Sequence, residues 1–209
     1  MVANGFEAGS RALRALGMPI PDSAIARRAE DLIGDVEPAF LINHSVRAYA
    51  WAVELASHDQ LQFDAEILYV SSLLHDIGLV PEYDIGGCFE IDGAVAAERF
   101  ALDHGQTPER ARAIYDVIAL HMRADIPPGS TSEDILLNDS TGVDVTGYRI
   151  GDVRSAAIPK VLDAYPRLDF KQGFSALFAD QAARKPSCRV AEMVATGKLD
   201  AIAAAPFES

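Results

Sequence analysis

The chain has 209 residues, of which 49% are hydrophobic and 23% are charged, so its composition is that of a globular protein and excludes a disordered one. Its 31 acidic and 18 basic side chains give a formal net charge of −13. An acidic excess of this size disfavours binding to nucleic acid or to an anionic membrane, because both partners are negatively charged. We expect the acidic side chains to form mainly a solvated surface.

Apolar residues recur every three or four positions along most of the chain, which is the pattern of amphipathic helices, and strand signals are scarce. Asp64, Thr107 and Ser132 each stand where a helix is expected to begin. The sequence therefore predicts an all-α fold of seven to nine helices in one domain, residues 1–209. The expected helices cover residues 38–57, 64–78, 94–104, 107–122, a segment that begins at 132, and 155–165, 169–184 and 190–196.

The two cysteines, Cys88 and Cys188, do not form a Cys-x-x-Cys pair and are too few for a disulfide scaffold. We expect both thiols to be reduced and the protein to be cytoplasmic. Neither a signal peptide nor a run of about 18 apolar residues is recognisable, so no membrane span is predicted. Cys88 is a weak candidate nucleophile, because no nearby cation favours its thiolate.

Four residues have the chemistry of metal ligands: His44, the adjacent pair His75 and Asp76, and Asp144. An isolated histidine in an apolar helix is usually a hydrogen-bonded structural residue. Here, however, His75 and Asp76 follow one another at the end of an apolar helix, where the backbone leaves regular geometry and both side chains can converge. Asp144 stands between two valines, and a carboxylate buried there needs a partner. A divalent cation would satisfy two imidazoles and two carboxylates together.

The sequence resembles the HD superfamily of metal-dependent hydrolases, whose pattern is a histidine, then a His-Asp dipeptide, then a distant aspartate. The resemblance covers a core of about residues 37–153. It implies a helical bundle in which His44, His75, Asp76 and Asp144 hold one divalent metal ion. Zinc is the first choice, and iron, manganese, cobalt and nickel suit the same donors.

Within the superfamily the sequence is most similar to the cyanamide hydratase branch. The resemblance implies that Glu90 and His121 are polar active-site residues and that Arg47 and Phe89 lie at the substrate. The last aspartate departs from the branch, which tends to carry Asn and Gly after it. The residues that carry the similarity are His44-Ser45-x-Arg47, Phe89-Glu90-x-x-Gly93-Ala94 and Ile118-x-x-His121.

The resemblance implies a metal-dependent hydratase or hydrolase that activates water for attack on a small C–N compound such as cyanamide or a nitrile. In that case Asp76 or His121 would move the proton, and Glu90 would position the substrate.

Three alternatives remain open from the sequence. A nucleotide phosphohydrolase would need cations for the phosphate, and Arg47 and Arg123 are the candidates near the motifs. A dinuclear iron oxygenase would need further ligands, for which His104 and His121 are available. A domain that only senses a ligand would have lost catalysis; the presence of residues at all four metal positions counts against this alternative. The sequence also leaves open a homo-oligomer.

Overall fold

The structure is a computed structural model that describes residues 2–208, with side chains from residue 8 onward. These residues form eleven α-helices and two short 3₁₀ helices and contain no strand. The all-α class is confirmed, whereas the expected number of seven to nine helices is too low. The elements in chain order are α1 (Val2–Ala15), α2 (Ala24–Val36), α3 (Ala39–Asp59), α4 (Ala65–Leu74), η1 (Ile77–Leu79), α5 (Phe89–Asp103), α6 (Pro108–Leu120), α7 (Ser132–Thr146), η2 (Ile150–Asp152), α8 (Ile158–Ala164), α9 (Phe170–Arg184), α10 (Arg189–Ala195) and α11 (Lys198–Ala203).

The helices that the sequence did not predict, α1, α2 and α11, lie near the two ends of the chain. In α2 two of the four buried positions are alanines, Ala26 and Ala29, which add little to an apolar pattern. The start of α2 did carry a signal, because the side chain of Ser23 accepts a hydrogen bond from the Ala26 amide.

Side-chain caps fix the beginnings of the helices that carry the candidate residues. Asp64 accepts hydrogen bonds from two amides of α4, and Thr107 accepts one from the amide of Arg110 in α6, as the sequence predicts. The cap of α7 is Thr131 and not Ser132: the side chains of Thr131 and Asp134 each accept a hydrogen bond from the other's backbone amide.

α3 is the central element of the bundle. Most of its 21 residues are buried, including Tyr49 and Trp51, which have no exposed surface. It packs against α7 and α4, and α5 packs against α6. The buried apolar side chains of the described residues form one cluster that extends from Leu13 to Ile202. The prediction of one domain over residues 1–209 stays a prediction.

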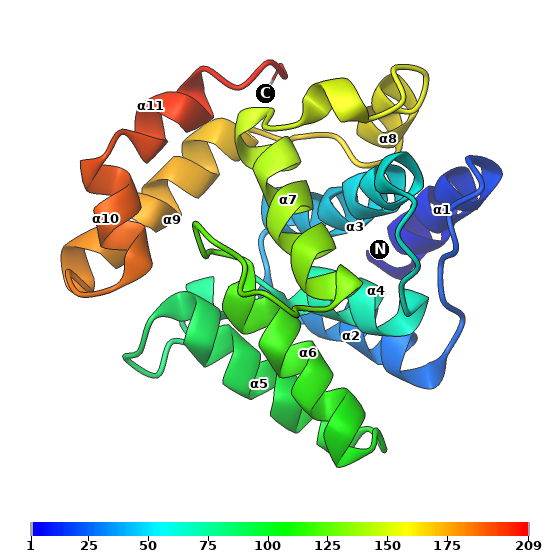
Figure 1. Cartoon of the computed structure of the whole chain (residues 1–209), viewed down its shortest axis with the longest axis horizontal. Coiled ribbons are helices and arrows are strands. Elements are labelled where there is room, and N and C mark those ends of the chain that lie inside the picture. The colour runs from blue at the N-terminus through cyan, green and yellow to red at the C-terminus, as the bar shows by residue number, and fades with distance from the viewer. Residues whose placement is uncertain (1, 209) are drawn as a thin grey trace.

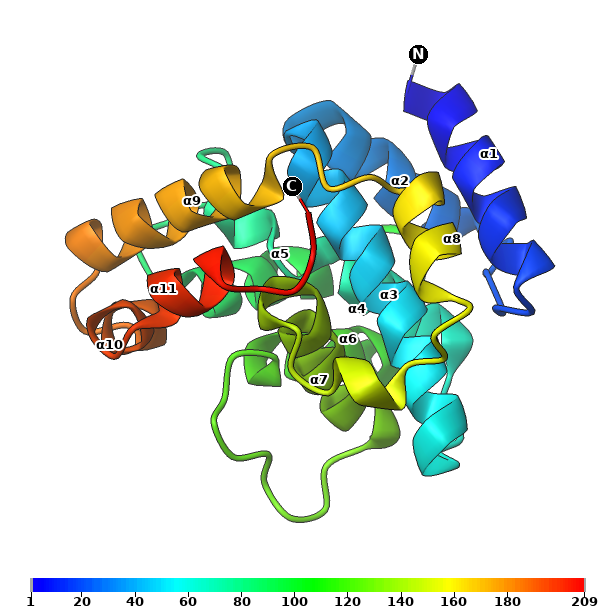
Figure 2. The ribbon, with the colours of Figure 1, turned by 90° about the horizontal axis from the view of Figure 1, so that it is seen from above.

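Two groups of helices flank this centre. Figure 1 shows α9, α10 and α11 together on one side and α1 with α8 on the opposite side. The view from above in Figure 2 shows the same separation. α9 also contacts α3, and α11 contacts α7. The C-terminal helices therefore lie against the central helices that carry His44 and Asp144.

Glycines let the chain after α4 pass close to the start of α5. A Cβ on Gly78 would lie 2.1 Å from the carbonyl oxygen of Phe89, a distance that no side chain tolerates. Gly93 faces this segment from α5, and a Cβ there would lie 3.3 Å from the Gly78 nitrogen. The chain around His75 and Asp76 is therefore held against α5 by backbone contact, and α4 ends at Leu74, earlier than the predicted residue 78.

Cys88 and Cys188 form a disulfide, with their Cα atoms 5.3 Å apart. The bond links the residue before α5 to the residue before α10. The expectation of two reduced thiols is therefore wrong, and the cytoplasmic location inferred from it stays a prediction. The two residues are 100 positions apart in the sequence, and only the fold brings them together. No helix in the described part of the chain is long and apolar enough to cross a membrane.

Replacing both cysteines with alanine should lower the free energy of unfolding by about 3–5 kcal/mol, because the bond closes a long loop in the unfolded chain. Urea denaturation of the oxidised protein and of the double variant measures the difference. The wild type under reducing conditions is the control and should match the variant. Equal stability of all three samples, or two free thiols in the untreated protein, would contradict the disulfide.

Candidate metal centre

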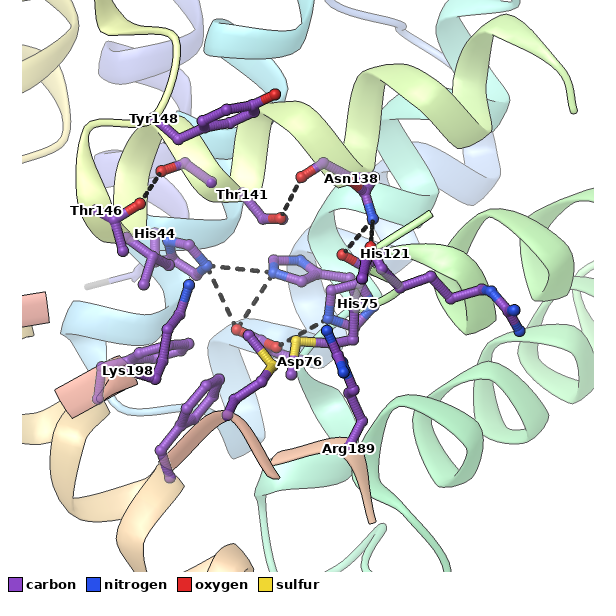
Figure 3. A pocket seen from close by; sticks show the side chains of 18 residues that line it. His44, His75, Asp76, His121, Asn138, Thr141, Thr146, Tyr148, Arg189 and Lys198 are labelled. Atoms are coloured by element: carbon purple, nitrogen blue, oxygen red, sulfur yellow. Dashed lines mark hydrogen bonds and ion pairs between the residues drawn. The ribbon is translucent and has the colours of Figure 1, made fainter. Parts of the chain in front are cut away.

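His44, His75 and Asp76 converge at one buried point. His44 comes from α3, whereas His75 and Asp76 follow the last residue of α4. The Nε2 atoms of the two histidines are 3.2 Å apart, and Oδ2 of Asp76 lies 3.4 Å from His44 Nε2 and 3.2 Å from His75 Nε2. Each of the three residues is at most 1% exposed. Figure 3 shows the three side chains pointing toward one another.

Each imidazole in this region is held through its Nδ1 atom. His44 Nδ1 lies 2.8 Å from Oδ2 of Asp144, and His75 Nδ1 lies 2.7 Å from the carbonyl oxygen of Ser72. A carbonyl oxygen only accepts hydrogen bonds, and an ionised carboxylate does the same, so Nδ1 carries the proton in both rings. The Nε2 lone pairs are therefore turned toward Asp76, in the arrangement that metal-ligating histidines adopt.

His121 has the same geometry. It follows α6, and its Nδ1 lies 2.6 Å from the carbonyl oxygen of Ile118. Its Nε2 is 3.8 Å from Oδ1 of Asp76, and its ring centre is 5.0 Å from that of His75. His121 therefore adds a third inward-facing Nε2 at the edge of the group.

The donors of this group fit a divalent cation. Oδ2 of Asp76 is buried and accepts no hydrogen bond, although most buried polar atoms in proteins have a partner. In the neutral imidazoles the Nε2 atoms that face it carry lone pairs and cannot donate to it; only a protonated ring could, and the raised pKa of His44 favours that charge. His44, His75 and Asp76 place one donor atom each within 4.8 Å of one another. Among the described residues no other group of three histidine, cysteine or acidic side chains meets this criterion.

The shifted pKa values of His44 and Asp76 indicate that this group of side chains favours a positive charge between the two residues. Burial would lower the pKa of His44, but its contacts with Asp144 and Asp76 raise it above the ordinary value. Burial would raise the pKa of Asp76, but His75 and His44 hold it well below its usual range. A metal ion can take the place of the proton that these carboxylates favour.

Asp144 does not belong to the group of converging donors. Its Oδ1 accepts hydrogen bonds from Arg47 Nε and Trp51 Nε1, each at 2.8 Å. Its Oδ2 accepts one from Arg47 Nη2 at 2.8 Å, in addition to the contact with His44 Nδ1. Both oxygens therefore lie behind His44, on the side away from its Nε2. In this structure Asp144 positions His44 through Nδ1, and its expected role as fourth ligand stays a prediction.

Arg47 is the buried partner of Asp144. It is fully buried, and besides its two bonds to Asp144 it donates to the carbonyl oxygens of Tyr165 and Pro166 through Nη1. Arg47 has no exposed surface and does not line the cavity described below, and its expected contact with substrate stays a prediction. The physical reason for its burial is charge: a fully buried carboxylate requires a cation beside it, and Arg47 is that cation.

Phe89 and Glu90 do not belong to the wall of the cavity described below, and their expected contacts with substrate stay a prediction. The Phe89 ring is buried and packs against His121 and Phe178, with ring centres 5.8 Å apart in each case. Glu90 is buried in the first turn of α5, and burial raises its pKa. His104, considered as a ligand for a second metal, lies at the far end of α5 with its ring against Phe100.

A cavity of about 310 Å³ opens onto the candidate metal-binding residues His44, His75 and Asp76. Its wall combines the ends of α4 and α6, one face of α7, and side chains of α9, α10 and α11. The sequence analysis did not identify the residues of the C-terminal helices, because no motif marks them. Residues of the wall that were not expected include Asn138, Thr141, Tyr148, Phe174, Phe178, Arg189, Met193 and Lys198.

Comparison with known proteins agrees with this geometry. The sequence model of the HD domain matches residues 41–145, which include His44, His75, Asp76 and Asp144. The chain belongs to the HD domain family. It is also similar to two cyanamide hydratases of Saccharomyces cerevisiae, DDI2 and DDI3, with 25% identity to each over 175 residues. The similar region covers 81% of this chain and 77% of each yeast protein.

The different positions of His75 and Asp144 predict different consequences of their loss. His75→Ala should remove the metal and leave the fold intact, because a separate apolar core stabilises the bundle. Asp144→Ala should lower the free energy of unfolding by about 3–5 kcal/mol, because it leaves buried Arg47 without its partner. Elemental analysis and urea denaturation measure the two effects. The exposed Asp163→Ala is the control and should change neither. Wild-type metal content in His75→Ala, or wild-type stability in Asp144→Ala, would contradict these roles.

His121 should make the metal-free protein sensitive to acid. Burial, followed by the charge of His75, lowers its pKa to about 4, whereas an unfolded histidine titrates near pH 6.5. Between these values the unfolded state binds more protons, so stability falls as pH falls from 6.5 to 4, by about 3 kcal/mol in total. The raised pKa of His44 does not change the stability within this pH range. Its contribution is fully present below pH 6.5 and is lost only at higher pH.

Urea denaturation at several pH values, after chelation of metal, tests this dependence. The variant His121→Gln should lose less stability than the wild type between pH 6.5 and 4. Parallel curves for the two proteins would show that His121 is not buried as a neutral imidazole.

Proposed function

We propose that this HD domain protein is a metal-dependent hydratase or hydrolase that adds water to a small C–N compound. The metal dependence is supported by three donor atoms that converge at the end of a cavity: Nε2 of His44, Nε2 of His75, and Oδ2 of Asp76, which accepts no hydrogen bond. The C–N class is supported by the similarity to the yeast cyanamide hydratases.

His44, His75 and Asp76 would hold the ion, and zinc suits two imidazole nitrogens and a carboxylate oxygen. When bound, a divalent cation supplies a Lewis acid and lowers the pKa of a coordinated water toward neutrality. Because HD domain proteins are generally metal-dependent hydrolases, this chemistry fits the family.

Asp76 and His121 are the residues placed to move a proton. Oδ1 of Asp76 faces His121 Nε2, and both atoms lie next to the two other histidines. His121 is neutral at pH 7, because its pKa is about 4, so its Nε2 can accept a proton or donate a lone pair to a metal. The Phe89 ring packs against His121 and Phe178 and gives this end of the site an apolar side.

A second candidate function, hydrolysis of a phosphate ester, is favoured by the basic side chains of the cavity wall, Arg123, Arg189 and Lys198. Phosphate recognition uses such cations. The metal-binding group would serve either reaction, so the substrate decides between them.

Assays of the metal-loaded protein against cyanamide, simple nitriles and 5′-nucleotides test this proposal. We expect turnover of cyanamide or a nitrile, and a loss of at least about 100-fold in His75→Ala because the metal is lost. His121→Gln separates its two roles: retained metal with turnover reduced about 100- to 10,000-fold indicates proton transfer, whereas lost metal indicates a ligand. Efficient hydrolysis of 5′-nucleotides without any turnover of C–N compounds would replace the proposal with the second candidate.

A further inference from the structure

We propose that Lys198 and Arg189 form a subsite for an anionic group of the substrate, a carboxylate or a phosphate. The inference rests on the proposed function, since it places this group in the cavity that ends at the metal-binding residues. The preferred substrate would then be a C–N compound that carries a negative charge and not a neutral molecule such as cyanamide.

Both residues enter the cavity from helices outside the matched HD domain. Arg189 begins α10 and Lys198 begins α11, whereas the match ends at residue 145. Their side chains line the same cavity as His44, His75 and Asp76. Figure 3 shows both of them extending toward this group, Lys198 on the side of His44 and Arg189 on the side of Asp76.

Lys198 is partly buried and differs from the buried cations of the protein. Arg47 and Arg167 lie against Asp144, and Lys185 lies 2.8 Å from Asp84. Lys198 has neither an ion pair nor a hydrogen bond with any residue that the structure describes. Burial alone lowers its pKa, with no carboxylate to offset the cost. Lys198 is only partly buried, so its ammonium group needs no partner for stability; without an ion pair in the protein it is available to an anion in the cavity.

Arg189 has part of its guanidinium group available. Its Nη1 lies 2.5 Å from Oε2 of Glu192, whereas its Nε is buried and has no hydrogen-bond partner. The preceding residue, Cys188, is bonded to Cys88, so the start of α10 is tied to the start of α5. The disulfide therefore fixes the backbone from which Arg189 reaches the cavity.

The charge of the cavity is opposite to that of the whole protein. The chain carries a net charge of −13, yet Asp76 is the only acidic residue among those that line the cavity, against Arg123, Arg189 and Lys198. A divalent cation bound at His44, His75 and Asp76 would add to this positive charge. The cavity volume of about 310 Å³ also lies in the range of small-molecule sites and leaves room for more than the three heavy atoms of cyanamide.

Two ligands of nearly equal size separate charge from shape: cyanoacetate, which carries a carboxylate, and cyanoacetamide, which is neutral. Isothermal titration calorimetry of the metal-loaded and the metal-free protein measures their dissociation constants. We expect cyanoacetate to bind at least about 10-fold more tightly, the usual effect of a charge-assisted hydrogen bond. Lys198→Met should remove this preference, Lys198→Arg should restore it, and the exposed Lys160→Met should leave it unchanged.

Inorganic phosphate as a competitor of cyanoacetate shows which anion the subsite prefers. Tighter binding of phosphate than of cyanoacetate would assign the subsite to a phosphate-bearing substrate. Weaker binding of phosphate would assign the subsite to a carboxylate. Equal affinity for cyanoacetate and cyanoacetamide would overturn the inference. So would a preference that survives in Lys198→Met and disappears with the metal, because the metal would then bind the anion. A preference that depends on Lys198, without turnover of any C–N compound, would refute the proposed reaction and leave the subsite standing.

Discussion

The buried carboxylate of Asp144 is the interaction on which the site depends. It contacts three side chains of α3, His44, Arg47 and Trp51, and Arg167 donates to its backbone carbonyl. Asp144 thereby connects α7 to the central helix and to the segment between α8 and α9. A fully buried carboxylate is costly, and here Arg47 and the hydrogen bonds offset the cost, holding the pKa of Asp144 well below its usual value. Because each partner requires the others, the arrangement fixes the relative position of these elements.

The same interaction determines which nitrogen of His44 faces the cavity. His75 and His121 reach the equivalent state by another route, since each directs Nδ1 to the carbonyl oxygen three residues earlier, in the last turn of its helix. A carbonyl oxygen in the last turn can accept such a bond, and that of Ile118 also accepts one from the His121 amide. One charged contact and two helix ends therefore orient three imidazoles toward Asp76. The contacts that set this orientation all come from residues of the protein.

The sequence indicated the residues of the centre better than their roles. His44, His75 and Asp76 could be singled out because their types and order resemble the HD pattern, and the structure brings them together. The role of Asp144 could not be assigned in the same way, because the sequence does not show on which side of His44 its carboxylate lies. One signal was available: His44, Arg47 and Trp51 are spaced to share one face of a helix, and Arg47 is a natural partner for a buried acid.

The C-terminal part of the site lay beyond such reasoning. The pairing of Cys88 with Cys188 and the entry of Arg189 and Lys198 into the cavity depend on how α9, α10 and α11 pack against the earlier helices. No local pattern records a contact between residues so far apart in the chain. The helices themselves were easier to predict, since caps and apolar periodicity are local, and the unexpected ones had alanine-rich faces or lay near the chain ends.

A crystal structure of the metal-loaded protein, with the ion located by its anomalous scattering, tests the central claim most directly. The arrangement predicts an ion bound by Nε2 of His44 and His75 and by Asp76, with Asp144 still bonded to Arg47 and to Nδ1 of His44. An oxygen of Asp144 among the ligands of the ion, with its bonds to Arg47 broken, would contradict this account.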